Sequence, residues 1–437
     1  MYPQEYSCFS VLTEIKTKRP AEISTKRGKD MKKWVATVLA LVMALGLCSV
    51  SWADATTAKY PDGVTEDSFE SGKSIYWTCG DQTGYASTLR DAVETASNAT
   101  GDAIVLYCKA NEVITKSGAH VDVTKDITIY ANGADFGGND LSIGTYKAPA
   151  KNPTTVNIYN AKNLVVWGQP VDQRADVWNV NFYDCQNTGS NFLMYRGKED
   201  GKATLNLTMT NCTADGFADS TIHTTADGTI TLKNCEFKNN PAPVNIAHKQ
   251  AGSMVVEIAH CSFASCGTAS TTNTLNQYAA PIRFVNNGGG SLTTTVDNVT
   301  FTGTVGNNGD ILVGDGRTGK TSTAVTATVT NTNANVQAQE PGYYTENGES
   351  DVDKVTKAEV KSSEKLTVKP VAEGDGKVTL EKETVPSSNN HYYYYSPSTD
   401  TTTTKGSPKT FDAGIALYVG MAVTSAAGLA YSGKKKF

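Results

Sequence analysis

The sequence predicts an all-β fold, a parallel β-solenoid, because one short pattern recurs at a nearly constant interval. An alternating apolar/polar strand, then Asn, Asp or His, then Cys occurs four times, at Cys185, Cys212, Cys235 and Cys261, which lie 27, 23 and 26 residues apart. A fixed period of this size is typical of solenoids. A fifth copy has Val299 in the place of the cysteine. No helical pattern separates the copies, so we expect each copy to form one coil.

A second, weaker strand recurs between these copies, around Ile222, Ile246, Ile282 and Ile311. We therefore expect two strands and two turns in each coil. Because side chains of a strand alternate between its two faces, the cysteines and the isoleucines should form two ladders inside the solenoid. The valine in the fifth copy indicates that the cysteine position requires a small buried hydrophobe, so the thiols are predicted to be structural. Asn or Asp before the cysteine suits a tight or bulged position.

These repeats extend from about Thr83 to Ala338 and resemble the right-handed parallel β-helix of pectate-lyase-like surface proteins and enzymes. The resemblance implies the architecture and leaves the activity open. The net charge of −5 gives no reason to expect nucleic acid as a partner.

The N-terminal region indicates secretion. Residues 1–30 are polar and are predicted to be a dispensable extension, with Met31 as the true start. Residues 31–53 have a basic start, a short apolar run and a small-x-small site, so we expect a signal peptide cleaved after Ala53. The alternative is a membrane anchor, although the apolar run is short for a bilayer span of about 20 residues. Residues 54–84 are interpreted as a leader.

The predicted β-helix domain covers residues 85–340 and begins with a helix over Ser87–Ser97 that should cap the first coil. Its apolar face consists of Leu89, Ala92, Val93 and Ala96. Strands are expected at 103–108, 126–130, 157–159, 163–167 and 177–183, with a Gly-rich turn at 132–140. That turn carries two aspartates, but its spacing matches no calcium-binding loop, so we predict neither a metal nor a cofactor. The Thr- and Ser-rich segment 267–278 is expected to be a loop on the binding side.

The C-terminal region indicates anchoring at the cell surface. Residues 341–386 are charged and could form short strands, and residues 387–406 are interpreted as a low-complexity stalk. Residues 407–437 combine a short motif, an apolar segment at 413–431 long enough for a transmembrane helix, and three terminal lysines, Lys434–Lys436. The motif consists of Ser407, Pro408, Lys409, Thr410 and Phe411.

This arrangement resembles the cell-wall sorting signal of Gram-positive surface proteins. The resemblance implies that a sortase cuts after Thr410 and joins it to the peptidoglycan precursor. Phe411 stands where the family usually has Gly. The tail is therefore either cut by a sortase that accepts Phe or retained as a membrane anchor, and both outcomes place the solenoid outside the cell.

Seven cysteines follow the predicted cleavage site, and no Cys-x-x-Cys pair suggests zinc or redox chemistry. Four of them fit the interior ladder. A disulfide between Cys79 and Cys108 is an alternative for two of the others.

Candidate binding residues lie on the outward side of the weaker strand. His223 and Arg283 occupy equivalent places beside Ile222 and Ile282, and Arg196 could share their outer row. Other polar candidates are Asp172, Arg174, Asp215, Asp219, His248, Lys249 and Asp315. A solvated outer face explains most such residues, and we assign no catalytic residue.

We therefore predict a surface-displayed adhesin or glycan-binding protein, whose ligand is an unknown host or environmental glycan or protein. The alternative is a polysaccharide lyase or a glycoside hydrolase of the β-helix type, and hydrolysis would require two carboxylates.

Overall fold

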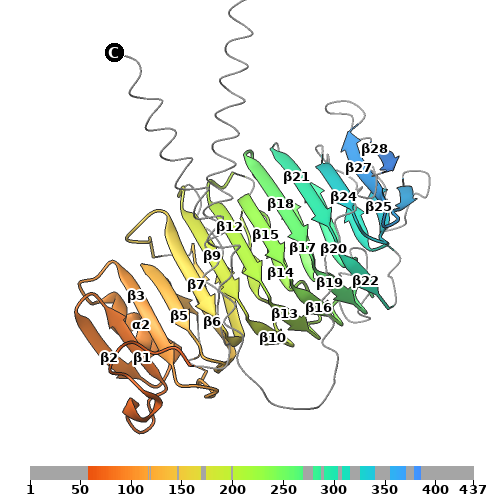
Figure 1. Ribbon diagram of the computed structural model, residues 1–437. Helices are drawn as coiled ribbons and strands as arrows, with labels where there is room; N and C mark the ends of the chain where they lie inside the picture. The colour runs from red at the N-terminus through yellow and green to blue at the C-terminus, as the bar shows by residue number, and fades with distance from the viewer. Residues whose placement is uncertain are drawn as a thin grey trace, which may run out of the picture. The chain divides into compact units, whose positions relative to one another are not determined.

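The computed structural model is an all-β parallel solenoid of about seven turns (Figure 1). It describes residues 58–384 except 117, 119, 145–146, 169–173, 198–199, 269–278, 287–289, 304–307, 315–324, 340–354 and 371–377. The predicted signal peptide, the stalk, the sorting motif and most of the segment 267–278 lie outside the described residues.

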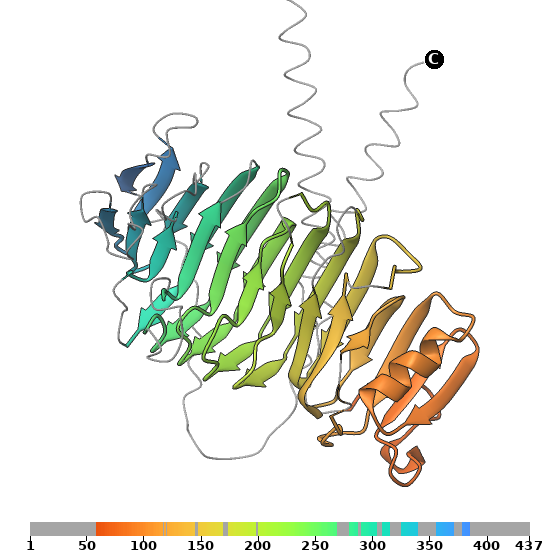
Figure 2. The same ribbon diagram turned by 180° about the vertical axis from the view of Figure 1, so that it is seen from behind.

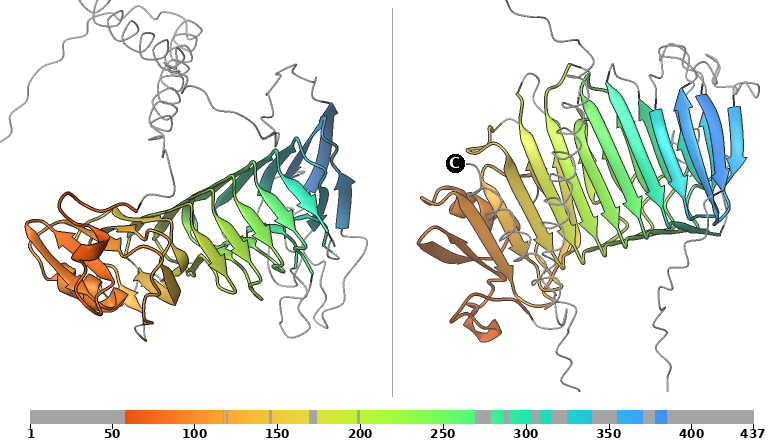
Figure 3. Two further views of the ribbon diagram at one scale, coloured as in Figure 1. Left: turned by 60° about the horizontal axis from the view of Figure 1, so that its bottom comes forward. Right: turned by 45° about the horizontal axis from the view of Figure 1, so that its top comes forward.

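Sheet one is a continuous face along the solenoid, and Figure 3 shows its strands side by side. In spatial order its strands are β2 (Gln82–Ala86), β1 (Ile75–Cys79), β3 (Ala103–Cys108), β5 (Asp126–Tyr130), β7 (Thr154–Tyr159), β9 (Val177–Tyr183), β12 (Thr204–Thr210), β15 (Asp227–Lys233), β18 (Ser253–Ala259), β21 (Ser291–Asp297), β24 (Val325–Thr330), β27 (Glu364–Pro370) and β28 (Val378–Thr384). Every pair from β3 to β24 is parallel, as expected when each coil returns to the same face.

Sheet two starts as single strands and then divides into two branches. The undivided part consists of β4 (Val121–Asp122), β6 (Asp135–Ile143) and β8 (Lys162–Gly168). The first branch contains β10 (Gln186–Thr188), β13 (Thr213–Asp215), β16 (Glu236–Lys238), β19 (Ser262–Ala264) and β22 (Thr300–Thr302). The second branch contains β11 (Leu193–Tyr195), β14 (Ile222–Thr224), β17 (Val244–His248), β20 (Ile282–Asn286), β23 (Ile311–Val313), β25 (Asn335–Gln339) and β26 (Val355–Glu359).

Each regular coil therefore has three strands, for example β12, β13 and β14, and the prediction of two was wrong. The strand of sheet one ends before the cysteine, and a corner separates it from the short strand that follows. At this corner Asp184, Asn211, Asn234, His260 and Asn298 have φ values between 51° and 55°. Asn and Asp tolerate this left-handed conformation better than most residues, so the prediction of a tight position is confirmed.

The interior cysteine ladder is confirmed, although its members lie at the corners. Cys185, Cys212, Cys235 and Cys261 are each 2% exposed, and Val299 is fully buried in the fifth coil. The isoleucine ladder needs one correction. Val244, rather than Ile246, pairs with both Ile222 and Ile282. Ile246 also points inward, but it lies two residues further along β17, where it pairs with Thr224.

The N-terminal end of the solenoid is closed by an antiparallel hairpin and a helix (Figure 2). Helix α2 (Leu89–Ser97) begins at Thr88, whose side-chain oxygen accepts a hydrogen bond from the Asp91 N–H. Its predicted apolar face is buried and packs on β1, β2, β3 and β4, so the prediction of a capping helix is confirmed. Strands β1 and β2 and the short helix η1 (Glu66–Ser68) lie within or next to the segment interpreted as a leader.

One other expectation at this end was wrong, and the alternative of a disulfide does not hold. The Gly-rich segment at 132–140 forms the start of β6, with an irregularity in the pairing between Asp135 and Asn139. Cys79 and Cys108 are free, because β1 and β3 run antiparallel and place the two residues at opposite ends of the pair, opposite Ile104 and Ile75.

The C-terminal end is closed by strands of the charged segment at 341–386. Strand β26 pairs antiparallel with β25. Strands β27 and β28 extend sheet one, because β27 pairs antiparallel with β24 and β28 pairs antiparallel with β27. The last strand carries Glu381, Lys382 and Glu383. Charges on an edge strand oppose further strand pairing. No helix in the described ranges is long and apolar enough to cross a membrane, and the predicted span at 413–431 lies outside them.

Candidate functional site

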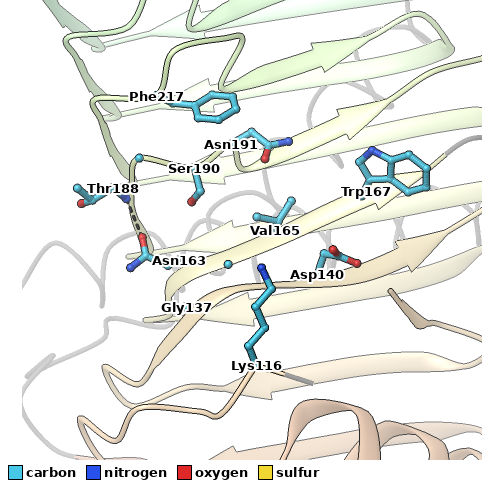
Figure 4. A pocket seen from close by; sticks show the side chains of 12 residues that line it. Lys116, Gly137, Asp140, Asn163, Val165, Trp167, Thr188, Ser190, Asn191 and Phe217 are labelled. Carbon is cyan, nitrogen blue, oxygen red and sulfur yellow. Dashed lines mark hydrogen bonds between the residues drawn. The ribbon is translucent and has the colours of Figure 1, made fainter. Parts of the chain in front are cut away.

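The outer surface of sheet two has an open hollow of about 430 Å³ where the sheet divides (Figure 4). Strand β8 runs straight through this region. On the next coil, β10 pairs with it at Gln186 opposite Lys162 and β11 at Leu193 opposite Val166. Residues 187–192 therefore stand opposite residues 163–165, and the longer segment bulges outward. The hollow is lined by Lys116, Gly137, Gly138, Asp140, Asn163, Val165, Trp167, Thr188, Gly189, Ser190, Asn191 and Phe217.

The floor of the hollow comes from alternate residues of β8. Asn163, Val165 and Trp167 point outward, while Leu164 and Val166 are buried in the core. Asn163 has a φ of 52°, and its Oδ1 accepts a hydrogen bond of 2.8 Å from the Thr188 N–H. This contact ties the bulged corner to the straight strand, so it fixes the width of the hollow.

The walls carry polar groups that have no partner. Within the described ranges, the Lys116 ammonium, the Ser190 hydroxyl and the Asn191 amide form no hydrogen bond or ion pair. Figure 4 shows the Lys116 side chain extending into the hollow toward Val165. Phe217, from the turn after β13, adds an aromatic ring on the following coil. Apolar rings beside unsatisfied donors and acceptors are what a small polar ligand requires.

Trp167 is fixed by a stacked histidine. The ring centroids of His120 and Trp167 are 4.5 Å apart with an interplanar angle of 7°. The His120 Nδ1 lies 2.6 Å from the Asp140 Oδ1, which completes a chain from a carboxylate to the indole. One face of the indole is therefore occupied, and Asp140 already has a partner.

His223 and Arg283 lie in one outward row as predicted, but Arg196 does not, because Met194 occupies that place on β11. His223 pairs with Asn245, which pairs with Arg283, and Met194 pairs with both His223 and Trp167. The row thus leads from the hollow to the predicted residues. Arg283 is only 3% exposed and its Nη1 donates a 2.7 Å hydrogen bond to the Asn245 Oδ1. His223 is half-buried and Arg196, two residues beyond Met194, is exposed.

The surroundings of His223 strongly shift the pKa of its imidazole. Burial, followed by the positive charges of Arg283, Arg196 and Lys249, lowers the pKa of its imidazole to about 3 from the usual 6.5. His223 is therefore neutral at neutral pH, in a region where cations dominate the electrostatic field.

Among the other candidates, His248 is fully buried between two acceptors. Its Nε2 lies 2.7 Å from the Asp227 Oδ1, and its Nδ1 lies 3.0 Å from the Asn286 Oδ1. The Asp227 Oδ2 also accepts from the Gly252 N–H. This network links successive coils where the chain returns to sheet one, so it is structural.

The remaining candidates do not join the hollow. Asp215 accepts from Asn239 Nδ2, Asp219 accepts from the Ser220 N–H, and Arg174 pairs with Asp176. Asp172 and Asp315 lie outside the described residues. Among the described residues, no group of three or more His, Cys, Asp or Glu side chains is arranged to hold a metal ion.

A column of stacked tyrosine rings also lies on the outer face of sheet one. Tyr107, Tyr130, Tyr159 and Tyr183 stack with centroid separations of 4.9 to 5.2 Å and interplanar angles of 12° to 25°. Since each ring uses its faces against its neighbours, little ring face is left for a ligand. Burial raises the pKa values of Tyr107, Tyr159 and Tyr183. The stacked tyrosines therefore stabilise the packing of successive coils.

The sequence interpretation missed Trp167, Phe217 and the corner at 188–191 as site residues. One signal was present, since Val165 and Trp167 place two large apolar side chains on the outward side of a strand. The width of the hollow depends on the pairing register between β8 and the divided strands, which local sequence does not contain.

Comparisons with protein-family models and with curated proteins give no match. One solved structure, from Geobacillus virus E2 and described as ORF18, aligns with 60% of this chain and 66% of its own, just under two-thirds of its length. The identity is 10% and the TM-score is 0.20, so this likeness carries no argument about fold or activity.

Proposed function

We propose that this protein is a surface-displayed β-solenoid that binds a glycan in the hollow beside Trp167. The observation that carries the proposal is the combination of apolar rings with unpaired polar groups in one hollow. Sugars present apolar C–H faces and many hydroxyls, so they match an indole and a phenyl ring flanked by Ser190, Asn191 and Lys116.

Display at the surface is supported by the sequence of the two ends. Residues 31–53 resemble a secretory signal, and residues 407–437 resemble a sorting signal. In this proposal a sortase and the peptidoglycan precursor are partners in anchoring, and a Gram-positive bacterium is the source. If the tail is not cut, its apolar segment at 413–431 holds the protein in the membrane. An adhesin would use the hollow toward a host or environmental glycan.

The alternative function is polysaccharide degradation, and one observation favours it. His120 forms a close pair with Asp140, which lines the hollow, and such a pair is suited to moving a proton. Asp140 is the single carboxylate among the described residues that line the hollow. Hydrolysis of a glycosidic bond normally uses two carboxylates. The hollow would therefore suit a lyase better than a hydrolase.

A glycan array with the purified protein tests the proposal. We expect selective binding to a set of related glycans, lost in Trp167→Ala and retained in the control Tyr159→Ala, which removes an aromatic ring from sheet one. Loss of binding in both variants, or in neither, would contradict the assignment of the hollow. Appearance of unsaturated or reducing ends in the bound glycans, abolished by His120→Gln, would select the enzyme.

A further inference from the structure

A second feature lies next to the hollow, along the same outward row. Trp167 pairs with Met194, and Met194 pairs with His223. Neighbouring strands are about 4.8 Å apart, so the backbones of Trp167 and His223 are separated by about 10 Å along the solenoid. A short oligosaccharide that occupies the hollow and extends along the solenoid would therefore reach His223.

Unpaired positive charges surround this end of the row. Arg196 follows β11 and is exposed, and Lys249 follows β17 and is half-buried. In the part of the chain that the structure describes, neither side chain forms a hydrogen bond or an ion pair. Arg283, which is buried on β20 and bonded to Asn245, adds a third charge to the local field. All three charges act on His223 and lower its pKa.

We propose that the glycan in the hollow carries an anionic group, a carboxylate or a sulfate, that binds between Arg196 and Lys249 beside His223. This inference rests on the proposed function. The planar guanidinium of Arg196 can hold two oxygens of such a group, and Lys249 supplies a point charge. Arg283 does not touch the ligand. Neutral His223 adds an imidazole that can form a hydrogen bond with the ligand without a further charge.

The first experiment uses inorganic sulfate and requires no glycan. The pKa of His223 is measured by NMR with and without sulfate, in the wild type and in Arg196→Gln/Lys249→Gln. An anion at this place offsets the cations, so we expect sulfate to raise the pKa of His223 in the wild type and to have little effect in the double variant. Lys233→Gln, which removes an exposed lysine from sheet one, should respond like the wild type. A wild-type pKa that sulfate leaves unchanged would overturn the inference.

The second experiment compares one glycan backbone in neutral, carboxylated and sulfated forms. The wild type should bind at least one anionic form about tenfold more tightly than the neutral form, which corresponds to about 1.4 kcal/mol. The two anionic arms identify the source of the charge. In Arg196→Gln/Lys249→Gln the preference should disappear while binding of the neutral form persists.

The two proposals fail in different ways. Binding that depends on Trp167 but shows no preference for either anionic form would overturn this inference and leave the proposed function intact. A response of His223 to sulfate without binding of any glycan would overturn the proposed function and reduce the patch to a site for an adventitious ion only.

Discussion

At the scale of single residues, the cysteine column shows how one chemical property is repeated along the solenoid. The thiols of Cys212, Cys235 and Cys261 lie next to one another, and each donates to carbonyl oxygens of the surrounding strands. Hydrogen bonding to Cys212, together with burial, raises the pKa of Cys235 to about 12. Burial is the main reason why the pKa of Cys212 is raised. The pKa of Cys261 is raised first by its hydrogen bond with Cys235 and then by burial. The thiols stay protonated, so they are small hydrophobes with a weak donor.

Replacement of Cys235 tests whether the thiols act only as small buried hydrophobes. Cys235→Val should change the free energy of unfolding by less than about 1.5 kcal/mol, because the exchange conserves apolar volume. Cys235→Asp should prevent stable folding, because an unpaired charge would be buried. Urea denaturation of the two variants measures both effects. Native circular dichroism with lost glycan binding in Cys235→Val would instead show that the thiol takes part in function.

His223 predicts an acid-dependent loss of stability. Its pKa is about 3 in the folded protein and about 6.5 in the unfolded chain, so between these values the unfolded chain binds more protons. The free energy of unfolding should fall as the pH drops from 6.5 toward 3, with a contribution from this residue of up to about 1.4 kcal/mol per pH unit. His223→Gln should flatten the profile in denaturation experiments. Identical pH profiles for the two proteins would refute this role.

At the scale of elements, the sequence predicted the strands that obey simple alternation. Strands β3, β5 and β9 and the apolar face of α2 agree with the expected ranges because local pattern determines them. The short strand after each cysteine was missed, since three residues after a corner, as in Glu236–Lys238, show no period of their own. The hollow was missed for a related reason. It arises where undivided β8 meets divided β10 and β11, and that difference between coils appears only after pairing.

Close stacking of coils leaves no room for a side chain at Gly228. Gly228, in β15, has a φ of +129°, and a Cβ at this position would lie 2.1 Å from the carbonyl oxygen of Leu205 on the previous coil. Gly228→Ala should therefore lower the free energy of unfolding by about 2–3 kcal/mol. Gly63→Ala is a matched control, because its φ is +81° but nothing lies within 4 Å. That control should show only the backbone cost of about 1–2 kcal/mol. Equal losses by denaturation would show that coil spacing does not limit this position.

At the scale of the whole molecule, the described solenoid has antiparallel strands at both of its ends. Hairpin β1–β2 and helix α2 close one end, and β26, β27 and β28 close the other. Parallel coils alone would leave open strand edges, which promote association between chains. The charged edge strand β28 therefore opposes end-to-end association of the solenoid.

The proposed anchoring gives a prediction for the intact protein in its native cell. If a sortase acts at the motif, the mature chain should end at Thr410, joined to a wall peptide, since Phe411 and the apolar segment at 413–431 would be removed. Mass spectrometry of fragments released by a peptidoglycan hydrolase identifies that end. An uncut tail found only in the membrane fraction would exclude sortase processing and leave the membrane anchor.

Binding of a glycan in the hollow of sheet two can be mapped by hydrogen–deuterium exchange with the glycan that binds most tightly on the array. We expect slower exchange at residues 163–167 and 188–191, because the ligand would cover β8 and the corner opposite it. Sheet one should be unaffected, including Tyr130 and Tyr159. Protection confined to the stacked tyrosines of sheet one, with no change at 163–167 or 188–191, would show that the glycan does not bind in the hollow.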